Sequence, residues 1–229
     1  MKRQRFWNRL APEDRDALEG VARMRFLPRS DILMHRGDTV SVVYLPVSAY
    51  ISNILYSGDG GTVMASNVGR EGVTGLAAFL ADQPIGWDVV VQVEGEAIAI
   101  PSENLRARFD DSPTLRASLL RLTHFQQLEA AQNALCNARH SVRARIARWL
   151  SELHDRTESL SFEITQEEVS ALLKAQRTTV NAAFKTLIEA HSIASGRSQI
   201  KIVNLNVLQA QACDCYPTLA TSRYWPLEN

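Results

Sequence analysis

One stretch of the chain, ITQEEVSALLKAQRTTVNAAFKTLIE (residues 164–189), carries side chains suited to hydrogen bonding with nucleic-acid bases and phosphates. An arginine can donate two parallel hydrogen bonds to a guanine edge, and a lysine meets a phosphate as a point charge. Hydroxyl and amide side chains add further donors and acceptors. The residues that we expect to contact double-stranded DNA are Thr165, Gln176, Arg177, Thr178, Thr179, Asn181, Lys185 and Arg197.

Two short helices must position these side chains. Thr165 and Glu168 fit a capping box, in which each side chain accepts a backbone N–H from the other residue. The turn KAQ leads to a second helix, which the first can brace in a DNA major groove. The positions expected to face inward are Val169, Leu172 and Leu173 in the first helix and Val180, Ala183, Phe184, Leu187 and Ile188 in the second.

The segment SIASGRSQIKIVN predicts a wing hairpin beside the second helix, with Gly196 in the turn and Arg197 at the tip. From Lys174 to Lys201, five basic residues minus one acidic residue, Glu189, leave an excess of four positive charges in a chain of zero net charge. The alternative is an ordinary helix pair with a solvated basic face. DNA binding is favoured because five features occur together: the capping box, the short turn, the polar face of the second helix, the wing and the local positive charge.

Two cysteines near the C-terminus, Cys213 and Cys215 in ACDCYP, form a Cys-x-Cys pair, which is a weak signal for metal binding or redox chemistry. No further ligand stands near them in the sequence, so we interpret them as plain thiols and expect neither metal nor cofactor. Three cysteines are too few for a disulfide framework, which favours a reducing compartment. The histidines, interpreted as scattered surface or helix-face residues, are His35, His124, His140, His154 and His191.

Short strands are predicted upstream. Residues 29–101 are rich in Val, Ile and Tyr and are broken by Gly and Asp, a pattern typical of a small barrel or sandwich. SGDGGT predicts a hairpin turn, and Pro12 suits the first turn of a short helix. The helix before residue 164 carries a basic face, which we interpret as solvated; its arginines are Arg139, Arg143, Arg145 and Arg148.

A long helix joins the two regions. Ser112 is suited to the N-cap and Pro113 to the first helical position, and neither Gly nor Pro follows for about two dozen residues. We expect its apolar stripe to pair with a second copy of the chain; the alternative is a helix that only covers the barrel. The expected dimer contacts are Leu115, Leu119, Leu122, Phe125, Leu128 and Leu135.

This order of elements resembles the Crp/Fnr family (cyclic-AMP receptor and fumarate–nitrate regulator) of bacterial transcription factors. HRGDTVSVVYLPVSAYISNI, GREGVTGL and the helix-turn-helix stretch carry the resemblance. It implies an α+β chain with an N-terminal jelly-roll β-barrel sensor domain (1–111), a long dimerisation helix (112–137) and a C-terminal winged helix-turn-helix domain with a tail (138–229). It also implies a cytoplasmic homodimer on a two-fold related DNA site, with RNA polymerase as a further partner.

The resemblance places an effector pocket at Glu71, Gly72, Trp87 and Asp88, although a Trp in a strand-rich segment is also typical of a core. Cyclic-nucleotide sensors of the family have an Arg-Ser or Arg-Thr pair where Trp87 and Asp88 stand, and Asp88 would repel a phosphate. Oxygen sensors of the family hold an iron–sulfur cluster on N-terminal cysteines, whereas the first 135 residues here contain none. We therefore expect regulation by neither signal, but by an unknown small molecule or by none.

The alternative function is a ligand-binding regulatory module that acts through protein contacts without specific DNA binding. An enzyme is not expected, because the sequence shows no metal-protease helix, nucleophile elbow, phosphate loop or dinucleotide fingerprint. A membrane partner is not expected either, because no apolar run approaches the roughly 20 residues that a bilayer crossing needs.

Overall fold

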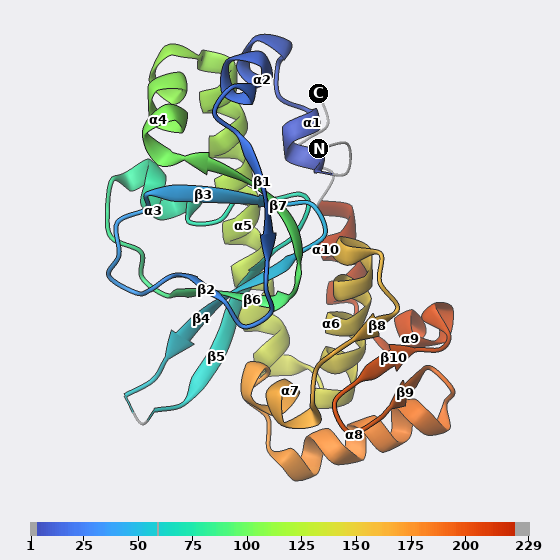
Figure 1. The fold of residues 1–229 in the computed structure, drawn as a ribbon. Helices are drawn as coiled ribbons and strands as arrows, with labels where there is room; N and C mark the ends of the chain where they lie inside the picture. Colours follow the sequence, from blue (N-terminus) through green and yellow to red (C-terminus); the bar gives the residue numbers. More distant parts are fainter. Residues whose placement is uncertain (1–3, 59, 223–229) are drawn as a thin grey trace.

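The computed structural model of the protein describes residues 4–58 and 60–222 (Figure 1). Its N-terminal part contains two antiparallel sheets whose strands are not in sequence order, which confirms the predicted jelly-roll. One sheet has the order β1 (Arg23–Leu27), β7 (Gly95–Pro101), β3 (Val42–Pro46). The other has the order β2 (Ile32–Met34), β6 (Asp88–Val93), β4 (Tyr50–Tyr56), β5 (Thr62–Val68).

Short helices and turns close the barrel. Pro12 opens a helix as predicted, and β4 and β5 pair from Tyr56↔Thr62 to Ile51↔Val68, which confirms the hairpin. Asp59, in the turn of this hairpin, lies outside the described residues. Gly60 has φ +80°, a conformation that glycine adopts without a steric penalty. The helices of this part are α1 (Arg5–Asn8), α2 (Pro12–Glu19), α3 (Leu76–Ala81) and α4 (Ser102–Asp111).

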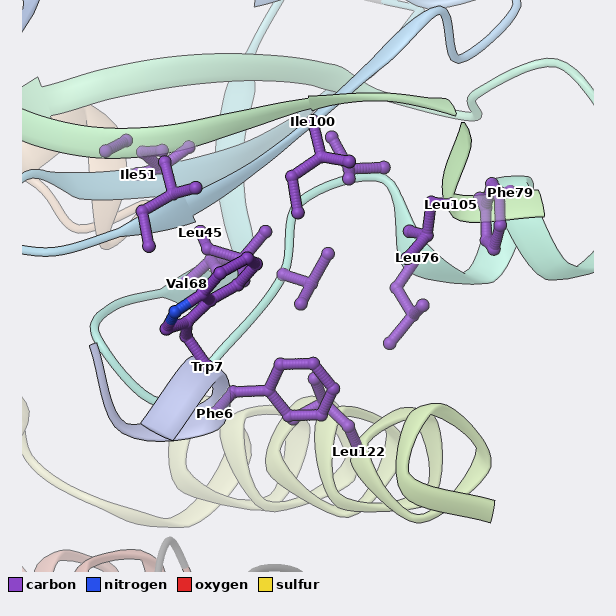
Figure 2. Close-up of a cluster of buried hydrophobic side chains, with 14 of the residues drawn as sticks. Phe6, Trp7, Leu45, Ile51, Val68, Leu76, Phe79, Ile100, Leu105 and Leu122 are labelled. Carbon is purple, nitrogen blue, oxygen red and sulfur yellow. The ribbon is translucent and has the colours of Figure 1, made fainter. Parts of the chain in front are cut away.

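The long helix α5 (Pro113–Arg139) begins where the sequence predicts. Ser112 caps it, its hydroxyl accepting from the backbone N–H of Leu115 at 3.1 Å, and the helix continues two residues past the expected end at 137. Its inner face completes the core of the sensor domain. Figure 2 shows Leu122 pointing from this helix into the buried cluster beside Phe6.

This packing corrects the expected dimer interface. Four of its residues are at most 1% exposed within a single chain, so they are not available to a second subunit. Leu128 and Leu135 are 44% and 50% exposed, and Leu120 is 52% exposed. The residues reassigned to the core are Leu115, Leu119, Leu122 and Phe125.

The C-terminal domain is a winged helix-turn-helix. The capping box of Thr165 and Glu168 is complete, and Lys174 (φ +46°) lies in the turn between the two helices. Gly196 N–H donates to the Gln199 carbonyl at 2.8 Å and closes the wing. The elements are α6 (Val142–Thr157), β8 (Ser161–Phe162), α7 (Gln166–Leu172), α8 (Arg177–Glu189), β9 (Ile193–Ser195), β10 (Ile200–Ile202), α9 (Leu205–Gln211) and α10 (Cys215–Ser222).

The two domains share a hydrophobic core. Tyr50, Ile54 and Met64, from β4 and β5, belong to the same buried cluster as the inward residues of α6, α7 and α8. Arg29 of the sensor domain forms an ion pair with Glu168, the capping residue of α7. The helix-turn-helix therefore packs directly against the sensor sheet. None of the helices in the described part of the chain has the length and apolar content that a bilayer crossing requires.

Candidate nucleic-acid interface

Helix α8 lies at the outer edge of the molecule (Figure 1), and its exposed face is mainly polar. Val180, Phe184 and Leu187 are buried beneath it and fix its orientation. Ile188, expected to face inward, is instead 39% exposed, because it lies at the boundary between the two faces near the end of the helix. The residues of α8 and its N-cap that were expected to contact DNA are all exposed: Gln176, Arg177, Thr178, Thr179, Asn181 and Lys185.

The two cations of α8 form weak surface ion pairs. Arg177 Nη1 lies 3.2 Å from Glu167 Oε1, and both side chains are more than two-thirds exposed (69% and 68%). Lys185 Nζ lies 3.9 Å from Glu189 Oε1. Exposed pairs of this kind contribute about 0–1 kcal/mol, so either cation can exchange its carboxylate for a nucleic-acid group at little cost.

The other two residues expected to touch DNA occupy different places. Arg197 is exposed in the loop that joins β9 and β10 of the wing. The Thr165 hydroxyl accepts from Glu168 N–H at 3.1 Å and donates to the Glu168 carboxylate at 2.9 Å. Thr165 therefore organises the start of α7, and its hydroxyl is already engaged in the cap.

A cavity of about 310 Å³ lies between the second sensor sheet and α5. Trp87 lines it, as expected, and so do Gln126 and Gln127 of α5. Asp88 does not line it. The Asp88 carboxylate accepts from Arg36 N–H at 2.7 Å and from the Tyr56 hydroxyl at 2.8 Å, and this second hydrogen bond raises the pKa of Tyr56.

Glu71 and Gly72 do not line this cavity either. Glu71 is 3% exposed, and its carboxylate lies 2.8 Å from Arg156 Nε. Gly72 lies close to the cavity wall, where an added Cβ would be 2.8 Å from Val68 Cγ1 and 3.6 Å from Gln126 Nε2. Of the four residues expected in an effector pocket, Trp87 alone lines the cavity.

A buried charge cluster links the sensor domain, α5 and α6. Arg156 of α6 forms ion pairs with Glu71 of the sensor domain and Glu129 of α5, and its Cζ lies 5.6 Å from the ring centre of Tyr50. Burial acts to lower the pKa of Arg156, but the Glu129 and Glu71 carboxylates raise it well above its usual value.

The basic face of α6 is thus partly buried, contrary to the expectation that it is solvated. Arg148 is 3% exposed; its Nη2 donates to Asn133 Oδ1 at 2.8 Å, and its Nη1 lies 3.6 Å from Glu152. Arg145 is 7% exposed and donates to the carbonyl of Leu173. Asn133 and Leu173 lie on other elements, so these two contacts could not be predicted from the sequence, although the i, i+4 pair of Arg148 with Glu152 could.

Cys213 and Cys215 are free thiols, but other potential ligands do lie close to them in the fold. Both are buried, and a third cysteine, Cys136 of α5, lies with its Sγ 3.5 Å from that of Cys213. The hydrogen bond between these two groups lowers the pKa of the Cys213 thiol, and the nearby charge of Arg148 acts in the same direction. His140, which follows the end of α5, lies with Nδ1 3.4 Å from the Cys215 sulfur.

Two family models match the chain, one for each domain. A model of the Crp-like helix-turn-helix domain matches residues 144–211, and a model of the cyclic nucleotide-binding domain matches residues 24–112. A search of curated protein sequences finds no match.

Solved structures share the whole architecture. FixK2 from Bradyrhizobium japonicum is 16% identical with a TM-score of 0.70, and the alignment covers 84% of this chain and 98% of that one. The c-di-GMP responsive global regulator CLP of Xanthomonas campestris is 16% identical with a TM-score of 0.67 (85% and 100% covered). A CRP-family transcriptional regulator from Thermus thermophilus is 18% identical with a TM-score of 0.65 (82% and 96% covered). At these identities the likeness is one of fold.

Proposed function

The chain belongs to the Crp/Fnr family of transcription regulators, and we propose that it acts as a homodimer that binds a two-fold related DNA site through α8 and the wing. The observation that carries the proposal is the outward face of α8, where Arg177, Asn181 and Lys185 are exposed over a fully buried apolar face. A major groove about 12 Å wide admits one such helix. RNA polymerase is the further partner that membership of the family suggests.

Arg177 and Lys185 have different roles in this proposal. Arg177 is the first residue of α8, and the N-terminal residues of a recognition helix are those that reach base edges. Lys185 lies two turns further along the same face, where backbone phosphate is the nearer partner. Arg177 should therefore determine which DNA sequence is preferred. Lys185 should increase the affinity for DNA of any sequence.

Replacing Arg177 with alanine should cost about 1–3 kcal/mol on the best site and relax the preference at one base pair in each half-site. Lys185→Ala should weaken binding to all sequences alike and lower the salt slope by about one unit for each phosphate that the lysine neutralises. Selection from a random duplex pool at two salt concentrations measures both effects.

Arg25→Ala is the control, since it removes an exposed cation from β1, outside α8 and the wing, and it should bind DNA as the wild type does. If Arg177→Ala selects the same half-site as the wild type with equal stringency, Arg177 does not read a base. If the wild type selects no sequence at all, the alternative function, a regulatory module that acts through protein contacts, is favoured.

The outer face of α5 supports the proposed dimer. Leu128, Ala131, Leu135 and Ala138 are all exposed and recur at the three- and four-residue spacing of a coiled-coil seam. Exposed leucines on one stripe of a helix favour association with an equivalent helix, and the small alanines let two helices approach closely. The second copy of α5 is the partner whose stripe fits, because a two-fold interface uses the same patch on both subunits.

The cavity beside α5 suits an uncharged effector. None of the described residues that line it is charged, and apolar side chains such as Leu55, Val73 and Leu76 form much of its wall. Trp87 Nε1 and Asn53 Oδ1 are buried there without a hydrogen-bond partner among the described residues. A small neutral molecule that accepts from Trp87 and donates to Asn53 would satisfy both atoms.

Cyclic AMP and cyclic GMP are expected not to bind at micromolar concentrations, because the cavity offers no cation to a cyclic phosphate among the residues that the structure describes. Isothermal titration calorimetry of the purified protein with each nucleotide tests this expectation, and 5′-AMP serves as the comparison ligand. Saturable micromolar binding of a cyclic nucleotide in preference to 5′-AMP would contradict it.

A further inference from the structure

Four potential metal ligands converge where α5 ends. They are the Sγ atoms of Cys136, Cys213 and Cys215 and a ring nitrogen of His140, and all four lie within 4.8 Å of one another. The three cysteines are buried and His140 is partly buried. Every cysteine of the chain is in this cluster, although Cys136 and Cys213 are 77 positions apart.

The spacing suits a single tetrahedral ion. Thiolates bound about 2.3 Å from one zinc ion lie about 3.8 Å apart in a tetrahedron. The Cys136 and Cys213 sulfurs are 3.5 Å apart, and the Cys215 sulfur is 3.4 Å from His140 Nδ1. An iron–sulfur cluster needs wider spacing, because its thiolates bind different iron atoms.

The neighbours of these ligands provide the support that metal sites use. A histidine that binds a metal through one ring nitrogen usually donates from the other to a carboxylate, which fixes the ring. Here His140 has Nδ1 toward Cys215, and its Nε2 lies 3.2 Å from Asp214 Oδ1. Gln132 Nε2 donates to the Cys215 sulfur at 2.9 Å and so helps to orient that side chain.

We propose that Cys136, His140, Cys213 and Cys215 form a structural zinc site of the Cys₃His type. Its ligands join two segments: the end of α5 with its C-cap, and the loop after α9 together with the first residue of α10. Helix α6, the first helix of the DNA-binding domain, begins two residues after His140. A bound ion would hold the C-terminal segment against the junction between the dimerisation helix and the DNA-binding domain.

The site is distinct from the proposed dimer seam. Cys136 lies on the inner face of α5, in line with Glu129 and Asn133, whereas Leu135 and Ala138 point outward. Zinc binding and dimerisation can therefore be perturbed separately. Zinc binding is also measured without DNA, so the zinc site and the proposed function can fail independently.

The full-length protein, purified under reducing conditions, is expected to contain a single zinc ion per chain by elemental analysis. Exchange with cobalt should give the near-ultraviolet thiolate-to-cobalt absorption and visible bands of a tetrahedral ion. Cys213→Ser and His140→Ala should each abolish stoichiometric binding. Asp214→Asn should weaken zinc affinity by about 10- to 100-fold in a chelator competition, since it removes only the partner of the histidine. His35→Asn, an exposed histidine of the sensor domain, is the matched control and should bind as the wild type does.

Zinc should also raise the unfolding temperature of metal-free protein in proportion to the logarithm of its concentration, because an ion that binds the folded chain stabilises it. This titration uses the wild type, so it tests the site even if a cysteine variant fails to fold. The proposal is overturned if the reduced wild type binds neither zinc nor cobalt. It is equally overturned if the Cys213→Ser variant still binds a single zinc ion per chain. It is also overturned if the native protein contains an iron–sulfur cluster, or if Cys136 and Cys213 form a disulfide that persists in reductant.

Discussion

Replacing Arg156 with methionine is expected to destabilise the protein by about 3–5 kcal/mol, because removing one partner of a buried ion pair leaves an uncompensated buried charge. Arg156 is 1% exposed and forms ion pairs with Glu71 and Glu129, which are themselves 3% and 1% exposed. Methionine conserves most of the side-chain volume, so the loss measures charge rather than packing. The midpoint and slope of urea unfolding give the change in free energy.

Arg143→Met is the matched control. Arg143 lies on the same helix and is exposed, so this variant should change stability by less than about 0.5 kcal/mol. Adding Glu71→Gln and Glu129→Gln to Arg156→Met should recover part of the loss, because the amides carry no charge that needs a partner. Equal stability of the Arg156→Met and Arg143→Met variants would show that the buried pairs do not stabilise the fold.

Leu135→Glu should separate the proposed dimer. Leu135 is 50% exposed in a single chain and lies in the centre of the outer stripe of α5, so a glutamate there would carry an unpaired charge into the seam. A cost of about 3 kcal/mol raises the dissociation constant about 100-fold. Sedimentation or light scattering over a concentration series measures it, and DNA affinity should fall with it, because each subunit binds only one half-site.

Leu160→Glu is the comparison variant. Leu160 is a leucine of similar exposure (46%) that follows α6 and lies outside α5. The Leu160→Glu variant should have the same molecular mass in solution as the wild type. A wild-type monomer, or equal dissociation constants for wild type and Leu135→Glu, would contradict a dimer through this face.

The elements that the sequence predicts correctly are those specified by nearby residues. A capping box such as that of Thr165 and Glu168 lies within one helical turn, and a wing needs only a few residues on each side of Gly196. Ser112 and Pro113 likewise mark the start of α5 within two positions. Local hydrogen bonds and backbone preferences decide these features, so no distant contact is needed to predict them.

The burial of four apolar residues of α5 within a single chain escaped prediction for a different reason. Helix α5 carries apolar residues on two faces, and periodicity along one chain does not say which face covers the barrel. Leu119 and Leu120 are neighbours in the sequence, yet one is 0% exposed and the other 52%. Only the sensor core, into which Leu119 packs, decides between the faces.

The buried charges and the potential metal ligands escaped prediction because their partners are distant in sequence. Arg156 is 27 positions from Glu129 and still farther from Glu71, so on its own helix it resembles a solvated cation. Cys136 is 77 positions from Cys213. Tertiary packing brings such groups together, and no pattern among neighbouring residues in the sequence indicates which groups will meet.

The sensor and the DNA-binding domain are not interchangeable parts, because each completes the other. Tyr50, Ile54 and Met64 of the sensor belong to a core formed mainly by α6, α7 and α8. Gly69 of the sensor leaves room for α6, since an added Cβ would lie 2.6 Å from Arg156 Cγ. A chimaera that joins this helix-turn-helix to a foreign sensor would expose the apolar surface that now contacts β4 and β5. It would also leave Arg156 without the carboxylate of Glu71, unless the transferred part includes these sensor residues. Engineered or evolving variants of this regulator must therefore change both sides of the junction together.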